Sequence, residues 1–258
     1  MTRNFTFLGT GTSVGVPMLG CDCPVCTSTN PRNHRYRCAA LIRLSQGNIL
    51  IDTPPELRLQ LLRAGTHNIH ACLMTHFHAD HLHGMDDLRP IPRLIGGPVP
   101  IHCSGETERR IRESFSYAFG PAAEQMTAGF IPKLDFHRLV PGANEVLGEK
   151  VLAIPLEHAH FDVFGFRIAD MAYCTDVNKI PRSSMEMLKG LDILVLDALR
   201  RQPHPAHFSL DQALEMVERL SPRQAFFTHI SHDLEHEEVN DSLPPNVRLA
   251  YDGLSFPF

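Results

Sequence analysis

The apolar positions fall into short runs that are separated by polar, glycine-rich or proline-rich segments. Runs of about four to eight apolar or β-branched residues between turn residues are typical of strands. On this basis the chain is predicted to form strands at residues 5–8, 38–44, 48–52, 71–75, 99–103, 151–155, 164–168, 171–175, 193–196 and 225–228.

Other segments carry apolar residues at helical spacing. Residues 54–65 ("PPELRLQLLRAG") begin with proline and end with glycine, and residues 209–220 ("SLDQALEMVERL") begin with serine, a preferred N-cap. A third helix is predicted at 106–119, whereas residues 120–133, rich in proline, glycine and alanine, are predicted to form a loop or a lid. Because no linker or repeat divides the chain, we expect one α/β (α+β) domain over residues 1–258, with a sheet core flanked by helices.

The composition is that of an ordinary globular protein, with 43% hydrophobic and 21% charged residues in 258. A formal net charge of −5 and the lack of a basic stripe argue against nucleic acid as a partner. The N-terminal residues "MTRNFTFLGTG" lack the apolar run of a signal peptide, and no segment approaches the ~18 apolar residues of a membrane span. We therefore expect a cytoplasmic protein without a membrane partner, in which disulfides are disfavoured.

A dense polar cluster follows the apolar run 71–75. The segment "THFHADHLHG" carries His76, His78, Asp80 and His81. Such a set cannot be satisfied in an apolar core without a shared partner. Two imidazoles at His-x-His spacing can bind one metal ion, and the adjacent Asp and His can serve a second ion, as two-metal hydrolases require. A solvated polar loop is the alternative.

The order of several motifs resembles the metallo-β-lactamase superfamily of dinuclear metallohydrolases over nearly the whole chain. Beside the cluster just described, the motifs are Asp52 in "ILIDT", His158 in "PLEHAH", Asp176 in "YCTDV" and His229 in "FFTHISH". The resemblance implies a four-layered αββα sandwich with two divalent metal ions at one edge of the sheets. It implies that one metal is held by His76, His78 and His158, the other by Asp80, His81 and His229, with Asp176 as the bridge.

Several of these assignments have rivals in the sequence. His160 competes with His158, and the family pattern of His before a Gly-Phe-Arg strand favours His158. Taken alone, Asp176 could be an ordinary strand-end residue. We expect Asp52 to orient a ligand histidine rather than to bind metal. The histidines expected at the surface or in packing are His34, His67, His70, His83, His102 and His137.

Three of the seven cysteines stand close together in "GCDCPVCTS", residues 20–28. With the opening "FLGTGTSVGVP", this motif resembles the PhnP-type branch of the phosphodiesterases in the superfamily. In that branch Cys21, Cys23 and Cys26 would bind a structural zinc with His232, three residues after His229. Three thiolates and one imidazole make a closed tetrahedral site with no position for water. The alternative is three free thiols. The other cysteines are expected to be small buried hydrophobes: Cys38, Cys72, Cys103 and Cys174.

The segment "DALRRQPHPAHFSLDQAL" resembles the PhnP-family segment that places a histidine over the metals, and His207 matches it. A phosphodiester leaves as an alkoxide, so a histidine that protonates the leaving oxygen lowers the barrier. The candidate catalytic residues are therefore His207 and, beside its part in metal binding, Asp80. A position next to the following helix without a chemical role is the alternative for His207, His204 is its nearest competitor, and His236 stays unassigned.

The resemblance implies a dinuclear metal-dependent phosphodiesterase that hydrolyses small cyclic phosphates or phosphodiesters with a metal-bridging hydroxide and His207 as the general acid. Phosphoribosyl cyclic phosphates and 2′,3′-cyclic nucleotides are the substrates expected. The alternatives are an endoribonuclease of tRNase Z type and a PqqB-like carrier or accessory protein without enzymatic activity. The active-site metals could be Zn or Mn, with Fe also compatible with these ligands, beside one structural Zn. The partner expected is a small-molecule phosphodiester. A homodimer stays open, because the sequence does not fix the oligomeric state.

Overall fold

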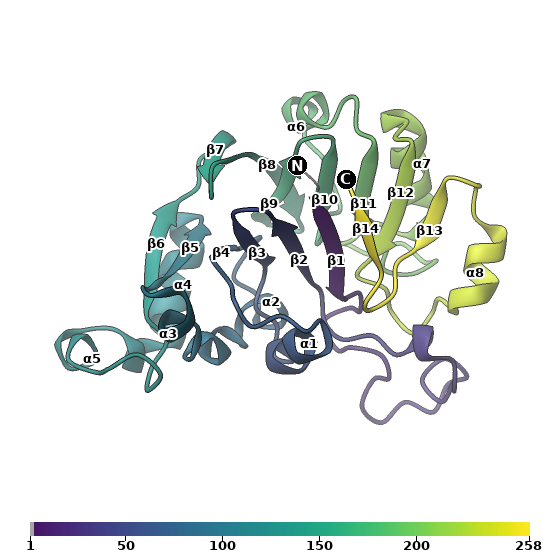
Figure 1. Cartoon of the computed structure of the whole chain (residues 1–258). Coiled ribbons are helices and arrows are strands. Elements are labelled where there is room, and N and C mark those ends of the chain that lie inside the picture. Colours follow the sequence, from purple (N-terminus) through teal and green to yellow (C-terminus); the bar gives the residue numbers. More distant parts are fainter. Residues whose placement is uncertain (1–2) are drawn as a thin grey trace.

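Two seven-stranded sheets face each other in the computed structural model, which describes residues 3–258 (Figure 1). Across the first sheet the strands are β14 (Ser255–Pro257), β1 (Asn4–Gly9), β2 (Ala39–Leu44), β3 (Gly47–Ile51), β4 (Ala71–Leu73), β5 (Val99–Cys103) and β6 (Leu134–Arg138). Across the second they are β13 (Val247–Leu249), β12 (Gln224–Thr228), β11 (Ile193–Asp197), β10 (Met171–Cys174), β9 (Phe161–Ile168), β8 (Glu149–His158) and β7 (Gly142–Val146).

Helices cover the outer face of each sheet. The first sheet packs against α1 (Leu57–Arg63), α2 (Ala79–Leu82), α3 (Ile91–Ile95), α4 (Gly105–Ser114) and α5 (Pro121–Glu124). The second packs against α6 (Arg182–Met187), α7 (Leu210–Leu220) and α8 (His236–Ser242) (Figure 1). Short 3-10 helices lie at η1 (Pro31–Asn33), η2 (Met85–Leu88) and η3 (Ser116–Ala118). The layers run helix, sheet, sheet, helix, which confirms the αββα sandwich.

The central strands are buried on both faces, which explains why they read as continuous apolar runs. In β3, Ile49 and Ile51 point into the core between the sheets, and Leu50 points toward the helices. In β11, Val195 faces the other sheet and Leu196 faces α7 and its neighbours. Alternation between apolar and polar residues is lost when both faces of a strand are covered.

Parallel pairing gathers the polar strand ends at one edge of the sandwich. Strand β3 runs parallel to β4, and β10, β11 and β12 run parallel to one another. Asp52 and His229 follow directly on the last residues of β3 and β12, Asp176 stands two residues after the end of β10, and Asp197 is itself the last residue of β11. Because parallel strands end at the same side of a sheet, residues distant in the sequence meet there.

Two predicted boundaries are wrong. The helix predicted at 106–119 ends at Ser114, because the buried Phe115 leaves helical geometry (φ −115°, ψ 39°) and the chain continues as η3. The segment predicted as a loop or lid, 120–133, contains the short helix α5, and its Ala123 and Ile131 are buried against the first sheet's helical layer.

The strands predicted at 151–155 and 164–168 are also longer than expected. They form one antiparallel hairpin, β8–β9, in which His158 pairs with Phe161 next to the turn. The turn between them has Ala159 in the left-handed region at φ 53°. The polar residues near the turn hid these strand ends in the sequence. Among residues 3–258, no helix has the length and apolar character needed to cross a membrane.

Candidate metal centre and active site

Three histidines converge at the first cluster of the site. His76 and His78 come from the segment between β4 and α2, and His158 ends β8; their potential ligand atoms lie within 4.8 Å of one another. Nδ1 of His158 donates a hydrogen bond to the carbonyl oxygen of Ala206 over 2.7 Å, which leaves the lone pair of Nε2 directed away from that carbonyl. The rival His160 is exposed and belongs to no such cluster among the described residues.

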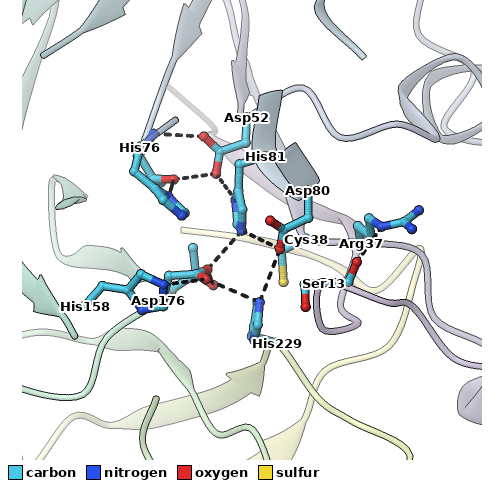
Figure 2. A network of polar contacts seen from close by, with 12 residues as sticks. Ser13, Arg37, Cys38, Asp52, His76, Asp80, His81, His158, Asp176 and His229 are labelled. Atoms are coloured by element: carbon cyan, nitrogen blue, oxygen red, sulfur yellow. Dashed lines mark hydrogen bonds and ion pairs between the residues drawn. The ribbon is translucent and has the colours of Figure 1, made fainter. Parts of the chain in front are cut away.

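A second cluster joins Asp80, His81, Asp176 and His229 (Figure 2). Oδ2 of Asp176 lies 3.0 Å from Nε2 of His81, and Oδ1 lies 3.3 Å from Nε2 of His229. The same Oδ1 is 3.9 Å from Nε2 of His158 in the first cluster. The carboxylate of Asp176 therefore stands between the two groups.

The buried nitrogens of these histidines fit metal binding. Within residues 3–258, Nε2 of His76, His81 and His229 is buried and has no hydrogen-bond partner. His81 donates a hydrogen bond from Nδ1 to Asp52. In the neutral ring, Nε2 therefore carries a lone pair, and this lone pair faces the carboxylates of Asp176 and Asp80. Acceptors that face acceptors in a buried site are unfavourable unless a proton or a metal cation lies between them.

Burial and charge act in opposite directions on these groups. Burial lowers the pKa of His76 well below its usual value and also lowers the pKa of His78 and His158, which keeps the three imidazoles neutral as metal ligands. Burial also lowers the pKa of His229, but Asp176 and other carboxylates more than offset it and raise that pKa to about 9. The second cluster thus attracts positive charge.

Asp52 lies behind the ligand groups rather than among them. Its Oδ2 accepts hydrogen bonds from Nδ1 of His81 and from the hydroxyl of Thr75, each over 2.8 Å, and its Oδ1 accepts from the backbone N–H of Thr75. The Thr75 oxygen in turn lies 3.0 Å from Nδ1 of His76. One buried carboxylate therefore fixes the orientation of an imidazole in each cluster.

The backbone is in an unfavourable conformation at three of these positions. Asp52, Asp176 and His229 have φ angles of 63°, 53° and 59°, in the left-handed region that side chains other than glycine rarely adopt. Each stands one or two residues after the end of its strand, where the chain must turn sharply. Strain of this kind persists only where the surrounding structure holds it, and it concentrates at functional sites.

His207 lies over both clusters and forms part of a pair that the sequence analysis missed. Its ring stacks on that of His229 at 4.5 Å and meets the ring of His158 edge-on at 4.7 Å. Its Nδ1 is 2.7 Å from Oδ2 of Asp197, which is fully buried. The sequence did contain a signal for Asp197. It ends the apolar run "ILVLD", just as Asp52 follows the apolar run "NILI".

The three clustered cysteines converge on one imidazole nitrogen. Nδ1 of His232 lies 3.2, 3.7 and 3.3 Å from the sulfurs of Cys21, Cys23 and Cys26. With Zn–S near 2.3 Å and Zn–N near 2.0–2.1 Å, tetrahedral geometry requires S–N separations of about 3.5 Å. The four side chains therefore have the donor set and the spacing of a structural zinc site.

The glycine-rich segment before the cysteines is tied to the turn that carries the ligand His229. The backbone N–H of Thr12 donates to the carbonyl oxygen of Ile230 over 3.1 Å, and the N–H of Ile230 donates to the carbonyl oxygen of Thr10 over 2.9 Å. Gly11 lets this segment pass close to Arg35, because a Cβ there would lie 2.9 Å from the carbonyl oxygen of Arg35. His236 is not part of the site: its Nδ1 is 3.1 Å from the buried guanidinium of Arg35.

A comparison with known families decides the membership of the chain. Residues 47–230 match the family model described as the beta-lactamase superfamily domain. The chain belongs to the β-lactamase superfamily. The two clusters of His and Asp in this β-lactamase-fold protein carry the donor atoms that a pair of divalent metal ions would need.

Two solved structures refine the comparison. A structure titled as a new diphosphatase from the PhnP family is 44% identical, has a TM-score of 0.93, and covers 100% of this chain and 98% of its own. It confirms the resemblance to the PhnP-type branch. A zinc-bound PqqB from Methylobacterium extorquens, 18% identical with a TM-score of 0.75 and coverages of 98% and 99%, shares the fold.

The curated relatives are longer proteins. An octanoyltransferase of Porphyromonas gingivalis is 34% identical over 251 residues, which are 96% of this chain and 50% of that protein. A ribonuclease Z of Anoxybacillus flavithermus is 29% identical over 149 residues, 53% of this chain and 42% of that protein. The chain thus spans half or less of the length of these relatives.

Proposed function

We propose that the protein is a dinuclear metal phosphodiesterase of PhnP type that hydrolyses small cyclic phosphates or phosphodiesters. The observation that carries the proposal is the carboxylate of Asp176, which stands between two sets of ligands, with the imidazole of His207 directly above. The likeness to the PhnP-family diphosphatase supports hydrolysis at a phosphorus atom. A small-molecule substrate fits the acidic charge of the chain.

Two divalent ions fit the donor atoms. His76, His78 and His158 would hold one ion, Asp80, His81 and His229 the other, and Asp176 both. Zn, Mn and Fe all accept such nitrogen and oxygen ligands. When bound, the ions neutralise charge on the phosphate oxygens and make a water molecule a nucleophile near neutral pH.

His207 would supply the proton that the leaving oxygen needs. Asp197 can only accept a hydrogen bond when it is ionised, so the proton of the neutral imidazole is held on Nδ1. In the protonated imidazolium, the second proton is on Nε2 and is available to a leaving alkoxide.

The two alternative functions have less support. An endoribonuclease of tRNase Z type needs a basic surface for its polyanionic substrate, and this chain has a net charge of −5. A PqqB-like carrier without enzymatic activity would not need two complete sets of metal ligands. The 18% identity to PqqB speaks for the fold alone.

The test combines metal analysis of the purified protein with turnover of bis(p-nitrophenyl) phosphate, 2′,3′-cyclic nucleotides, a phosphoribosyl cyclic phosphate and a nucleoside diphosphate ester. We expect about three metal equivalents, one of them from the structural zinc, and turnover of a cyclic phosphate. Protein that holds its metals and turns over none of these esters would contradict the proposal.

A further inference from the structure

An aromatic cleft of about 470 Å³ opens beside the first metal cluster. Its lining comes from the start of α4, from the β8–β9 hairpin and from the segment after β4, and includes Phe77, Glu106, Pro155, Phe161, Asp162 and Phe164. A volume of this size is typical of sites for small organic ligands. The metal ligands do not account for it.

Two phenylalanine rings connect the cleft to the metal site. The rings of Phe77 and Phe161 each lie 5.4 Å from the ring of His78, at interplanar angles of 80° and 85°. They meet each other edge-on at 5.5 Å. Phe161 stays 43% exposed, a large apolar surface next to a metal ligand. A group attached to a phosphate at the metals would therefore reach this ring.

The charged side chains beside the aromatic rings are largely paired. Glu106 forms ion pairs with both Arg109 and Arg110, and the guanidinium of Arg110 lies 5.2 Å above the ring of Phe77. The exposed face of Phe161 is therefore the feature that can recognise a ligand here, and a neutral planar ring could stack on it.

We propose that this cleft binds the nucleobase of the substrate, with Phe161 as the stacking surface. The inference rests on the proposed phosphodiesterase function and narrows its substrate class to nucleoside phosphodiesters such as 2′,3′-cyclic nucleotides. Phosphoribosyl cyclic phosphates lack a base that could stack on this ring. Phe161 is then a residue that determines specificity, and it takes no part in proton transfer.

The experiment compares two five-membered cyclic phosphates that differ in the base. Adenosine 2′,3′-cyclic phosphate carries a nucleobase, and glycerol 1,2-cyclic phosphate does not. Because stacking of one base on an aromatic ring is worth about 1–3 kcal/mol, Phe161→Ala should lower kcat/KM for the nucleotide about 5- to 150-fold. It should leave kcat/KM for the glycerol ester within about twofold of the wild-type value.

Two variants serve as controls. Phe161→Tyr keeps the ring and should retain the preference for the nucleotide. Phe130→Ala removes an exposed phenylalanine that does not line the cleft, and it should change neither substrate's kinetics. Equal losses on both substrates in Phe161→Ala, or no loss on the nucleotide, would overturn the inference and leave the phosphodiesterase in place. A metal-loaded wild-type protein that hydrolyses neither ester would overturn the proposed function and this inference with it.

Discussion

Asp197 accepts a hydrogen bond from Nδ1 of His207 over 2.7 Å, and both side chains are buried at the end of β11 above the metal ligands. The other oxygen of Asp197 has no hydrogen-bond partner among residues 3–258 and lies 3.9 Å from Nδ1 of His229. One carboxylate therefore faces both the proposed acid and a metal ligand. Two of the predictions below separate these roles.

The effect of His207→Ala should depend on the leaving group. A general acid contributes about 10²–10⁴ in rate, and more where the leaving oxygen is a poor anion. p-Nitrophenolate leaves without a proton, whereas a ribose oxygen does not. We expect a much larger loss on 2′,3′-cyclic nucleotides than on bis(p-nitrophenyl) phosphate, with both active-site metals retained. His204→Ala is the control and should have little effect. Equal losses would mean that His207 positions the phosphate instead.

Asp197→Asn should lower kcat without removing metal. An amide can present its NH₂ group to Nδ1 of His207, which favours the tautomer with the proton on the wrong nitrogen. Removing a carboxylate that orients a histidine of a metal site typically lowers activity or metal affinity about 10- to 100-fold. Steady-state kinetics should show that loss in kcat for cyclic nucleotides with KM little changed, and metal analysis should match the wild type. A loss of metal would instead make Asp197 a support for His229.

Removal of one zinc ligand should cost both metal and stability. Cys21→Ser or His232→Ala should lower bound zinc by one equivalent and reduce the free energy of unfolding by several kcal/mol, because binding at a structural zinc site contributes directly to folding. Asp22→Asn, at an exposed position between two of the cysteines, is the matched control. Elemental analysis and thermal unfolding measure both effects. Variants with full zinc content and an unchanged Tm would refute the assignment.

Asp176→Ala removes the carboxylate between the clusters. The variant should lose most phosphodiesterase activity and at least part of its active-site metal, while circular dichroism shows a fold that is largely intact. Without Asp176, Nε2 of His81 and Nε2 of His229 would lose their nearest shared anion. Turnover within a few-fold of the wild type would show that Asp176 does not bridge metals.

Stability should fall in mild acid partly through His102. Burial, and then the neighbouring His137, lower the pKa of His102 to about 4, so the unfolded chain binds its proton more tightly. The stability that this neutral ring contributes is complete above about pH 6.5 and is lost as the pH falls toward 4. Between pH 7.5 and 5.5, the Tm of the wild type should fall more steeply than that of His102→Gln. Metal loss affects both proteins alike, and parallel curves would contradict the prediction.

The sequence allowed the ligand set to be predicted, because its residues follow apolar runs that are easy to recognise. Asp52, Asp176 and His229 each come within two residues of the end of such a strand. The strands that were missed give a weaker signal. Strand β6, for example, lies at a sheet edge with its side chains largely exposed, so it carries no apolar run.

The residues around the ligands depend on contacts that no local pattern contains. In the sequence, Asp197 is only an aspartate at the end of an apolar run. Its role depends on the loop before α7, which brings His207 within hydrogen-bond distance of it. Phe77 and Phe161 gain their proposed role only because β4 and the β8–β9 hairpin meet at His78. Spacing in a single sequence reports contacts along one element, and these contacts join separate elements.

The left-handed backbone at Asp52, Asp176 and His229 has an evolutionary consequence. Glycine adopts this conformation with less strain than any other residue, by about 1 kcal/mol per position, yet glycine has no side chain to serve the site. In a metal-free chain, each of these residues therefore occupies a position whose backbone conformation favours glycine. A lineage released from selection for catalysis could relieve that strain by exchanging them for glycine. Degenerate descendants of such a hydrolase would then be recognisable by glycines at the ends of β3, β10 and β12.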